Sequence, residues 1–287
     1  MSSFGDLSTE AEIRDCAMKA KEKAIFVNDS LIPFHSFADF EHFYIGDEFC
    51  ERRLPSILTL KNMHNYYDRK DIKLTLATPY LTNEGIKKLT QILNFIAQGN
   101  VNLEEVVIND WGALRLLKDY NDRFRIVLGR ILVSRYLKEQ HSKKFAQQHL
   151  RNDKKVGFHC LFPDSFLDFI KEQNIACLEF NSYYHLAITH KQVSKYGFKV
   201  HIYYPFIYLT TSRYCTCING YRSYFRNSIE NCNEDCKEYI AVITNRHFAN
   251  GIFIKGNAYF IKQEKNLEDF NNLEVDRLIY NDFIKVS

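Results

Sequence analysis

Short apolar runs recur along the chain and alternate with segments of helical periodicity. Eight of the runs have the features of β-strands, because they are short, apolar and rich in β-branched or aromatic residues. They cover residues 24–27, 42–45, 73–78, 105–108, 125–128, 156–161, 176–180 and 199–209. Eight such strands with helices between most of them are typical of a parallel β/α barrel. We therefore predict a TIM-like (β/α)8 barrel of the α/β class, with an open doubly wound sheet as the alternative.

Helical patterns follow most of the predicted strands. Thr82 and the two residues after it have good helix-capping chemistry, and apolar residues then recur at helical spacing up to residue 96. No glycine-rich phosphate loop follows any predicted strand, so a nucleotide-binding doubly wound sheet has no support. Residues 140–155 are polar and basic. We predict that they form an insertion or a solvated helix rather than a binding patch.

The pattern changes after residue 236. Residues 239–243 and 251–261 are two further apolar runs, and residues 255–257 have the composition of a hairpin turn. These runs predict a short antiparallel β extension that packs on the barrel. The predicted division has three parts: an N-terminal tail or helix over residues 1–20, the barrel over 21–212, and a cysteine-bearing segment with the β extension over 213–287.

Composition and charge exclude several classes of protein. The 287 residues are 46% hydrophobic and 25% charged, which is the composition of an ordinary globular protein. The net charge of +3, with acids and bases interspersed, argues against a DNA-binding protein but leaves RNA open. The N-terminus is polar and acidic, and no apolar run approaches the ~18 residues of a membrane helix. We expect a cytoplasmic protein without a membrane span.

Four of the eight cysteines lie close together late in the chain. In a reducing compartment such clusters indicate metal ligands before disulfides. Cys215 and Cys232 are separated by 16 residues, and Cys232 and Cys236 by three. One distant cysteine and a close pair, placed after a strand end, indicate a metal ion or cluster. The fourth ligand must come from elsewhere, and we predict Cys50, which follows the second predicted strand.

Four thiolates suit either a 4Fe–4S cluster or a zinc ion. Structural zinc sites favour paired C-x-x-C knuckles, which this chain lacks, so we favour the 4Fe–4S cluster, with zinc or no metal as alternatives. Cys217 stands two residues after Cys215, and ligation by both is sterically awkward, so one of them is spare. The other cysteines have apolar neighbours and are predicted to be buried structural thiols. They are Cys16, Cys160 and Cys177.

Several polar residues stand at or just after the ends of predicted strands. In β/α barrels these ends carry the active site, so the residues should face one end of the barrel. We predict catalytic roles for Asp110, Arg130 and Glu179. We predict substrate binding by Thr78, Asn109 and Arg213. Ion pairs between the two acids and the two arginines are the alternative interpretation, and Arg213 could instead offset the charge of a thiolate cluster.

Four segments of the chain resemble one known family. The segments are LATPYLTNEG, VVINDWGALRLL, IVLGRILVSR and YYPFIYLTTSRYC, in that order. They are similar to the barrel proteins of peptidase family U32, over roughly residues 40–240. The similarity is greatest to the shorter, UbiV-like members, which carry a lone cysteine early and a C-x16-C-x3-C pattern late. Here that pattern corresponds to Cys50 in FCERR, then Cys215, Cys232 and Cys236, which selects Cys215 over Cys217.

The resemblance implies a function as well as a fold. It implies a 4Fe–4S barrel protein in an O2-independent hydroxylation, of the kind that acts on ubiquinone precursors or RNA bases. Some members act with a longer paralogue, so we expect a heterodimer and a small-molecule or RNA substrate. A non-catalytic iron–sulfur partner subunit is one alternative. A collagenase-like peptidase is another, but the family's peptidase signature G-A-L-C is replaced here by LEFNSYYH, which contains no cysteine.

Overall fold

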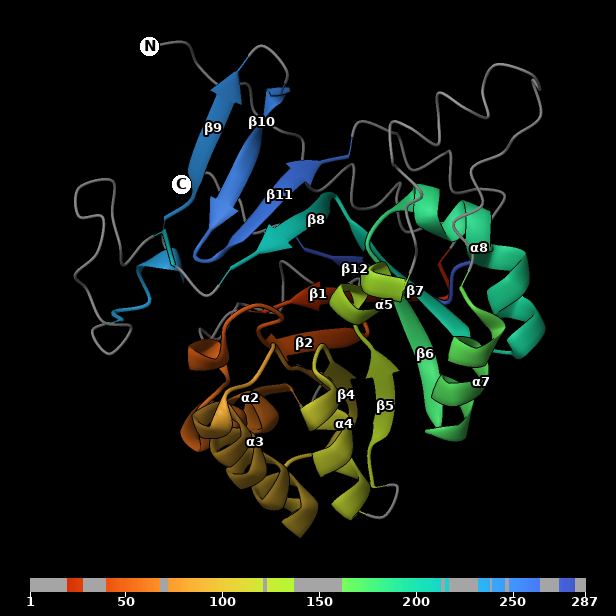
Figure 1. Cartoon of the computed structure of the whole chain (residues 1–287). Coiled ribbons are helices and arrows are strands. Elements are labelled where there is room, and N and C mark those ends of the chain that lie inside the picture. Colours follow the sequence, from red (N-terminus) through yellow and green to blue (C-terminus); the bar gives the residue numbers. More distant parts are fainter. Residues whose placement is uncertain are drawn as a thin grey trace, which may run out of the picture.

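A computed structural model of the chain shows a closed barrel with a smaller sheet at one end (Figure 1). The structure describes residues 20–27, 40–67, 72–120, 123–136, 162–212, 215–216, 232–237, 239–245, 248–263 and 274–281. Several predicted features lie outside these residues, namely the N-terminal tail, the basic segment 140–155, the predicted strand 156–161, Cys16, Cys160, Cys217 and Arg213.

The barrel consists of eight parallel strands. In the order of their hydrogen bonding they are β1 (Glu22–Phe26), β12 (Arg277–Tyr280), β7 (Lys199–Tyr204), β6 (Ile175–Phe180), β5 (Arg125–Leu128), β4 (Leu103–Ile108), β3 (Lys73–Ala77) and β2 (His42–Gly46), and β2 pairs again with β1. The predicted TIM-like barrel is thereby confirmed.

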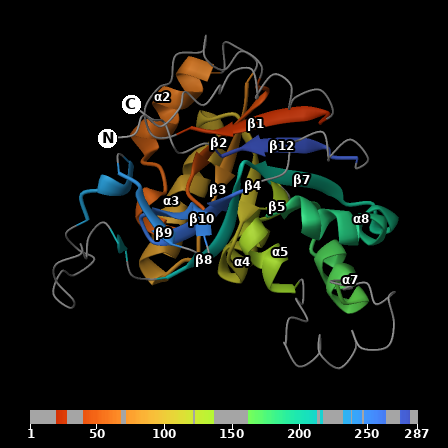
Figure 2. The same ribbon diagram turned by 90° about the horizontal axis from the view of Figure 1, so that it is seen from above.

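Helices and short turns connect the strands. The α-helices are α2 (Ile57–Tyr67), α3 (Asn83–Phe95), α4 (Trp111–Leu117), α5 (Arg130–Tyr136), α7 (Asp164–Glu172) and α8 (Tyr183–Tyr196). The shorter elements are η2 (Glu51–Arg53), η4 (Ile96–Asn100), η5 (Lys118–Tyr120) and η7 (Asp235–Lys237). Figure 2 shows these helices outside the barrel, with β1 and β12 side by side. Within the described residues, no helix is both long and apolar enough to cross a membrane.

Two predicted strands differ from the observed ones. The run 199–209 is divided at Pro205, which has no N–H to donate to a ladder, and the chain leaves the barrel there. The last barrel strand is β12, which we did not predict, so the predicted barrel boundary at residue 212 must be extended to include it. The barrel closes without residues 156–161, because β5 pairs directly with β6.

The inside of the barrel contains one buried layer to which every strand contributes one residue. These residues are Ala24, Tyr44, Ala77, Val107, Val127, Cys177, Tyr203 and Ile279. The small alanines offset the large tyrosines, so the layer fills the interior without a pore. Strand residues of the opposite parity point outward and join the helices in a second, larger core. Cys177 is fully buried in the inner layer, as predicted for a structural thiol.

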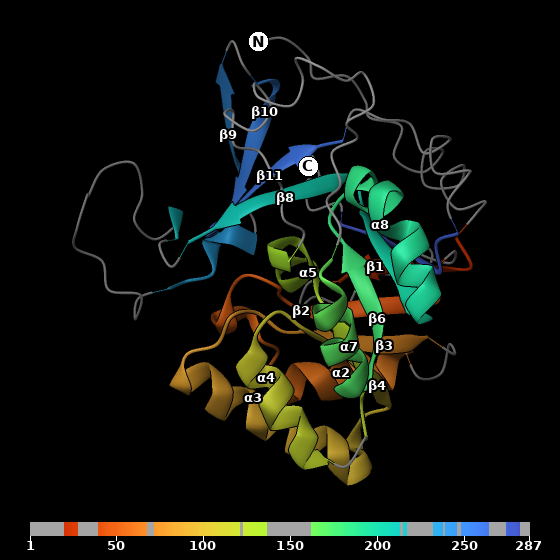
Figure 3. The same cartoon turned by 45° about the vertical axis from the view of Figure 1, so that its right-hand side comes forward.

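A four-stranded antiparallel sheet covers one end of the barrel. Its order is β8 (Phe206–Thr211), β11 (Ala258–Lys262), β10 (Phe248–Lys255) and β9 (Ala241–Asn245), which confirms the predicted β extension. Figure 3 shows this sheet on the side of the barrel opposite α3 and α4. Phe49, just after β2, stacks on Tyr208 at 5.0 Å and meets Phe260 edge-on at 5.3 Å. These ring contacts fix the sheet over the carboxyl ends of the barrel strands.

Candidate functional site

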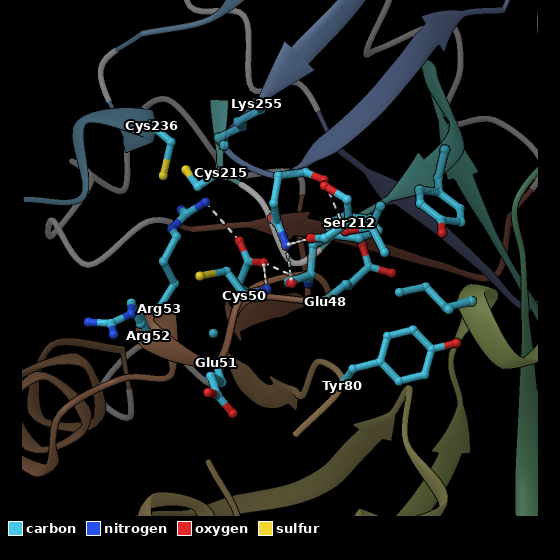
Figure 4. Close-up of a pocket in the computed structure, with 18 of the residues that line it drawn as sticks. Glu48, Cys50, Glu51, Arg52, Arg53, Tyr80, Ser212, Cys215, Cys236 and Lys255 are labelled. Atoms are coloured by element: carbon cyan, nitrogen blue, oxygen red, sulfur yellow. Dashed lines mark hydrogen bonds and ion pairs between the residues drawn. The ribbon is translucent and has the colours of Figure 1, made fainter. Parts of the chain in front are cut away.

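A cavity of about 820 Å³ lies between the barrel mouth and the antiparallel sheet (Figure 4). The barrel contributes residues 46–53, 80–82 and 130–131, which lie at or within a few residues after the ends of β2, β3 and β5. The sheet contributes residues 208–212 and the turn 255–257. The cavity therefore occupies the position at which β/α barrels carry their active sites.

The four cysteines that we predicted as ligands all line this cavity. They are Cys50, Cys215, Cys232 and Cys236, and the first comes from a loop that is far from the other three in the sequence. All four are thiols rather than disulfides. In Figure 4 the sulfur atoms of Cys215 and Cys236 lie next to one another, and Cys50 lies below them. Among the described residues, no three His, Cys, Asp or Glu side chains are drawn together closely enough to hold a metal ion.

The loop that carries Cys50 is held by the side chain of Asp47, three residues earlier. Asp47 Oδ1 accepts the backbone N–H groups of Phe49 (2.7 Å) and Cys50 (2.8 Å), and its Oδ2 pairs with Arg53 Nη1 at 2.7 Å. Glu51, the next residue, accepts the N–H and hydroxyl of Thr82 at 2.7 and 2.9 Å, which joins the loop to the start of α3. The two carboxylates therefore hold the loop backbone on either side of Cys50.

The surroundings of the thiols fit a group held by four thiolates. Burial, and then the charge of Asp47, raise the pKa of the Cys50 thiol to about 11, so a metal must displace its proton. Arg52 and Lys255 line the same cavity and would offset the negative charge of bound thiolates, whereas Arg53, which also lines it, is paired with Asp47. A Cβ atom on Gly256 would lie 3.4 Å from Cys236 Sγ and 3.9 Å from Cys215 Sγ, so the glycine leaves room beside both thiols.

Asp110 and Arg130, two of the three residues predicted to be catalytic, line the cavity. Asp110 caps α4, because its Oδ1 accepts the Gly112 N–H at 2.6 Å. Arg130 is buried and makes two hydrogen bonds to Glu48, at 2.9 and 2.6 Å. Its guanidinium also lies 3.8 Å from the centre of the Tyr203 ring. Arg130 is thus ion-paired, but with Glu48 and not with Asp110 or Glu179, the two acids named in the alternative interpretation.

Thr78 and Asn109, which we predicted to bind substrate, are buried and do not line the cavity. Thr78 donates its hydroxyl to the Val107 carbonyl at 2.9 Å. The Asn109 amide donates to the Thr78 carbonyl at 3.0 Å and accepts the Ile131 N–H at 3.1 Å. These contacts hold the ends of β3, β4 and β5 together beneath the cavity. Arg213 lies outside the described residues.

Glu179, the third predicted catalytic residue, lies inside the barrel. It is fully buried, and its two carboxylate oxygens accept the hydroxyls of Tyr44 (2.9 Å) and Tyr203 (2.6 Å). Burial, and then the charge of Glu48, raise its pKa to about 8 despite these two hydrogen bonds. Glu179 therefore carries a proton at neutral pH and belongs to the barrel interior rather than to the cavity wall.

Replacing Glu179 with glutamine should change how stability depends on pH. A pKa raised from 4.5 to about 8 means that the folded chain binds a proton that the unfolded chain releases, so stability falls as pH rises through this window. Glutamine does not titrate, so the free energy of unfolding of the Glu179→Gln variant should not fall in this way. We expect the difference in unfolding free energy, variant minus wild type, to rise by about 2 kcal/mol between about pH 6 and pH 8. Urea unfolding at several pH values measures this difference. The Glu84→Gln variant is the control, because that side chain is 79% exposed, and its profile should match the wild type.

Sequence reasoning missed several cavity residues. Glu48 and Phe49 follow β2 directly, in the same loop as Cys50, and their position after a strand end was the available signal. Tyr208 and Phe260 come from strands of the antiparallel sheet. Nothing in their own sequence context indicates that they face the barrel, because this depends on how the sheet is placed.

Comparisons with known proteins give remote structural likenesses. No protein-family model matches the chain, and no curated protein matches it. The chain is 9% identical to the U32 peptidase Mk0906, with a TM-score of 0.46 over 98% of this chain and 96% of that chain. It is 10% identical to a glycoside hydrolase family 18 N-acetylglucosaminidase from Paenibacillus barengoltzii, with a TM-score of 0.33 over 91% and 94% of the two chains. The similarity to the UbiV-like members of family U32 stays a prediction.

Proposed function

We propose that the chain binds a 4Fe–4S cluster through Cys50, Cys215, Cys232 and Cys236 and takes part in an O2-independent hydroxylation. The observation that carries the proposal is that Cys50 lines one cavity at the barrel mouth together with Cys215, Cys232 and Cys236, which lie more than 160 residues later in the chain. A longer paralogue is the proposed partner. The substrate is a small molecule or a single RNA base, since a cavity of about 820 Å³ suits ligands of that size.

The shape of the site supports a cluster over zinc. Structural zinc sites are closed, with four ligands around one ion and no space beside it. Here the thiols line a cavity that extends well beyond them, along the barrel mouth to Arg130 and Asn281. Cys50, Cys215, Cys232 and Cys236 would hold the cluster, which would supply one-electron transfer to or from a molecule in the remaining space.

The chain's own residues supply positioning and proton handling. Converting a C–H bond to C–O–H with water as the oxygen donor releases two electrons and two protons. Because a 4Fe–4S cluster would pass only one electron at a time, the reaction also requires an external two-electron acceptor of the flavin or quinone class, which the cluster would reduce in two steps. Asp110 lines the cavity and is held in place as the cap of α4, so its carboxylate is available as a proton acceptor. The pairing of Arg130 with Glu48 makes it a fixed part of the cavity floor.

Anaerobic purification followed by iron, sulfide and absorption measurements tests the proposal. We expect about four irons and four sulfides per wild-type chain. The Cys232→Ala variant should lose them, because one of four ligands is gone. The Cys177→Ala variant should retain them, because Cys177 lies inside the barrel and does not line the cavity.

Two results would contradict the proposal. Stoichiometric zinc in the wild type would make the four cysteines a structural site, and a colourless, metal-free chain would remove the cofactor altogether.

The hydroxylation has its own test, in cells grown without oxygen. Normal product levels with both Asp110→Asn and Arg130→Met variants would remove the catalytic roles proposed for these residues. Asparagine caps a helix as well as aspartate, so the Asp110 variant tests the charge alone.

A further inference from the structure

The turn between β10 and β11 contacts the segments that carry three of the four cavity cysteines. Its last residue, Asn257, bonds to Phe49, the residue before Cys50, and to Ser212, three residues before Cys215. The side-chain amide of Asn257 donates to the carbonyl of Phe49 at 2.8 Å and to the carbonyl of Ser212 at 2.9 Å. One side chain therefore joins the loop after β2 to the segment after β8.

The backbone of the turn makes further contacts on both sides of Cys215. The Asn257 carbonyl accepts the Ser212 N–H at 3.0 Å and the Thr211 hydroxyl at 3.1 Å. The Gly256 carbonyl accepts the Thr216 N–H at 2.9 Å. Hydrogen bonds to the turn therefore hold the chain both before and directly after Cys215.

Gly256 brings the turn against the thiols themselves. Its φ is +61°, a conformation that side-chain-bearing residues rarely adopt. A Cβ atom at this position would lie 3.3 Å from Cys236 Cβ and 3.4 Å from Cys236 Sγ, which requires the cysteine to move by a few tenths of an ångström. Both the conformation and the close approach require glycine at this position.

We propose that the turn formed by Lys255, Gly256 and Asn257 is the positioning element of the thiol site. It sets the places of Cys50, Cys215 and Cys236 relative to one another through the contacts described above. This inference rests on the proposed function, because it takes the 4Fe–4S cluster as the group that the thiols bind. Residues outside the ligand set that orient the ligands commonly change metal affinity by about 10–100-fold.

The test compares two turn variants with two matched controls. Asn257→Ala removes the bridging amide, and Gly256→Ala places a methyl group against Cys236. The control for the first is Asn100→Ala, since the exposed Asn100 amide also donates to two oxygens. The control for the second is Gly197→Ala, since Gly197 has a φ of +79° but open space where a Cβ would lie. Both glycine variants thus carry a similar backbone cost.

The measurements are the rate of iron loss to a chelator without oxygen, the reduction midpoint potential of the bound cluster, and thermal unfolding. We expect both turn variants to lose iron about tenfold faster than the wild type and to shift the potential. Both controls should keep the wild-type rate and potential, even where Gly197→Ala lowers the unfolding temperature as much as Gly256→Ala does.

The outcomes separate this inference from the proposed function. A wild type that carries iron, with an unchanged rate and potential in Asn257→Ala and Gly256→Ala, overturns the positioning role and leaves the proposed function standing. A wild type without iron or sulfide overturns both. If Gly256→Ala fails to fold, Asn257→Ala decides alone, because it alters no backbone conformation.

Discussion

Replacing Arg277 with methionine is expected to lower the free energy of unfolding by about 3–5 kcal/mol. Arg277 is the first residue of β12, and its side chain is only 2% exposed. It donates to Glu105 Oε2 at 2.5 Å and to Glu22 Oε2 at 2.9 and 2.7 Å. Removing the guanidinium leaves the buried Glu105 without its main partner, and an unpaired buried charge costs far more than a surface charge.

The charge balance at Glu105 supports this expectation. Burial alone would raise the pKa of Glu105, but the hydrogen bonds and charge of Arg277 lower it to about 2. Thr75 also donates to this carboxylate, at 3.1 Å. Glu105 is therefore ionised in the folded chain because Arg277 is present. The loss also affects closure of the barrel, because β12 pairs with both β1 and β7.

The Arg125→Met variant is the matched control for Arg277→Met. Arg125 donates to the same carboxylate at 3.0 Å, but its side chain is 45% exposed. Exposed pairs are worth about 1 kcal/mol or less, so the control should lose little in urea unfolding. The double variant Arg277→Met, Glu105→Gln should recover part of the loss, because it removes both buried charges. Equal losses in the two single variants would contradict the role of burial.

Most of the barrel could be predicted from the sequence, because its strands are short apolar runs separated by helical patterns. β12 was missed for a physical reason. It is four residues long and begins with an arginine, which in an isolated sequence looks like a solvated residue. Only the fold shows that Arg277 points inward to acids from β1 and β4. Pro205, which divides the predicted eighth strand, is a signal within the sequence itself, because a proline cannot donate a hydrogen bond inside a sheet.

The candidate site was predictable where it depended on strand ends, and less so where it depended on side-chain direction. Cys50 follows the barrel strand β2, so the barrel geometry predicts its place at the cavity. Cys215 follows β8 of the antiparallel sheet, so it reaches the same cavity through the packing of that sheet on the barrel. Glu179 occupies an inward position of β6, two residues after Cys177, and this alternation directs it into the barrel. Thr78 and Asn109 bond to the backbone of neighbouring strands, and such contacts depend on a register that no single strand encodes.

Replacing Arg130 with methionine is expected to cost about 3–5 kcal/mol of unfolding free energy, because it leaves Glu48 buried without its partner. The side chains of the pair are 1% and 3% exposed. Arg130 also donates to the Phe206 carbonyl at 3.2 Å, at the start of β8. The pair therefore joins the Cys50 loop to the strand that leads towards Cys215, so the loss should include packing of the antiparallel sheet.

A double-mutant cycle separates the pair from the other contacts of Arg130. The variants are Arg130→Met, Glu48→Gln and both together, measured by urea unfolding, and we expect a coupling of about 2–3 kcal/mol. Arg115→Met is the control, because Arg115 pairs with Asp119 on the surface, at 76% and 64% exposure, and should cost at most about 0.5 kcal/mol. Additive losses in the cycle would mean that Arg130 is held by its stacking on Tyr203 rather than by Glu48. The cavity floor would then depend on an aromatic contact, and substitution of Tyr203 would become the larger perturbation.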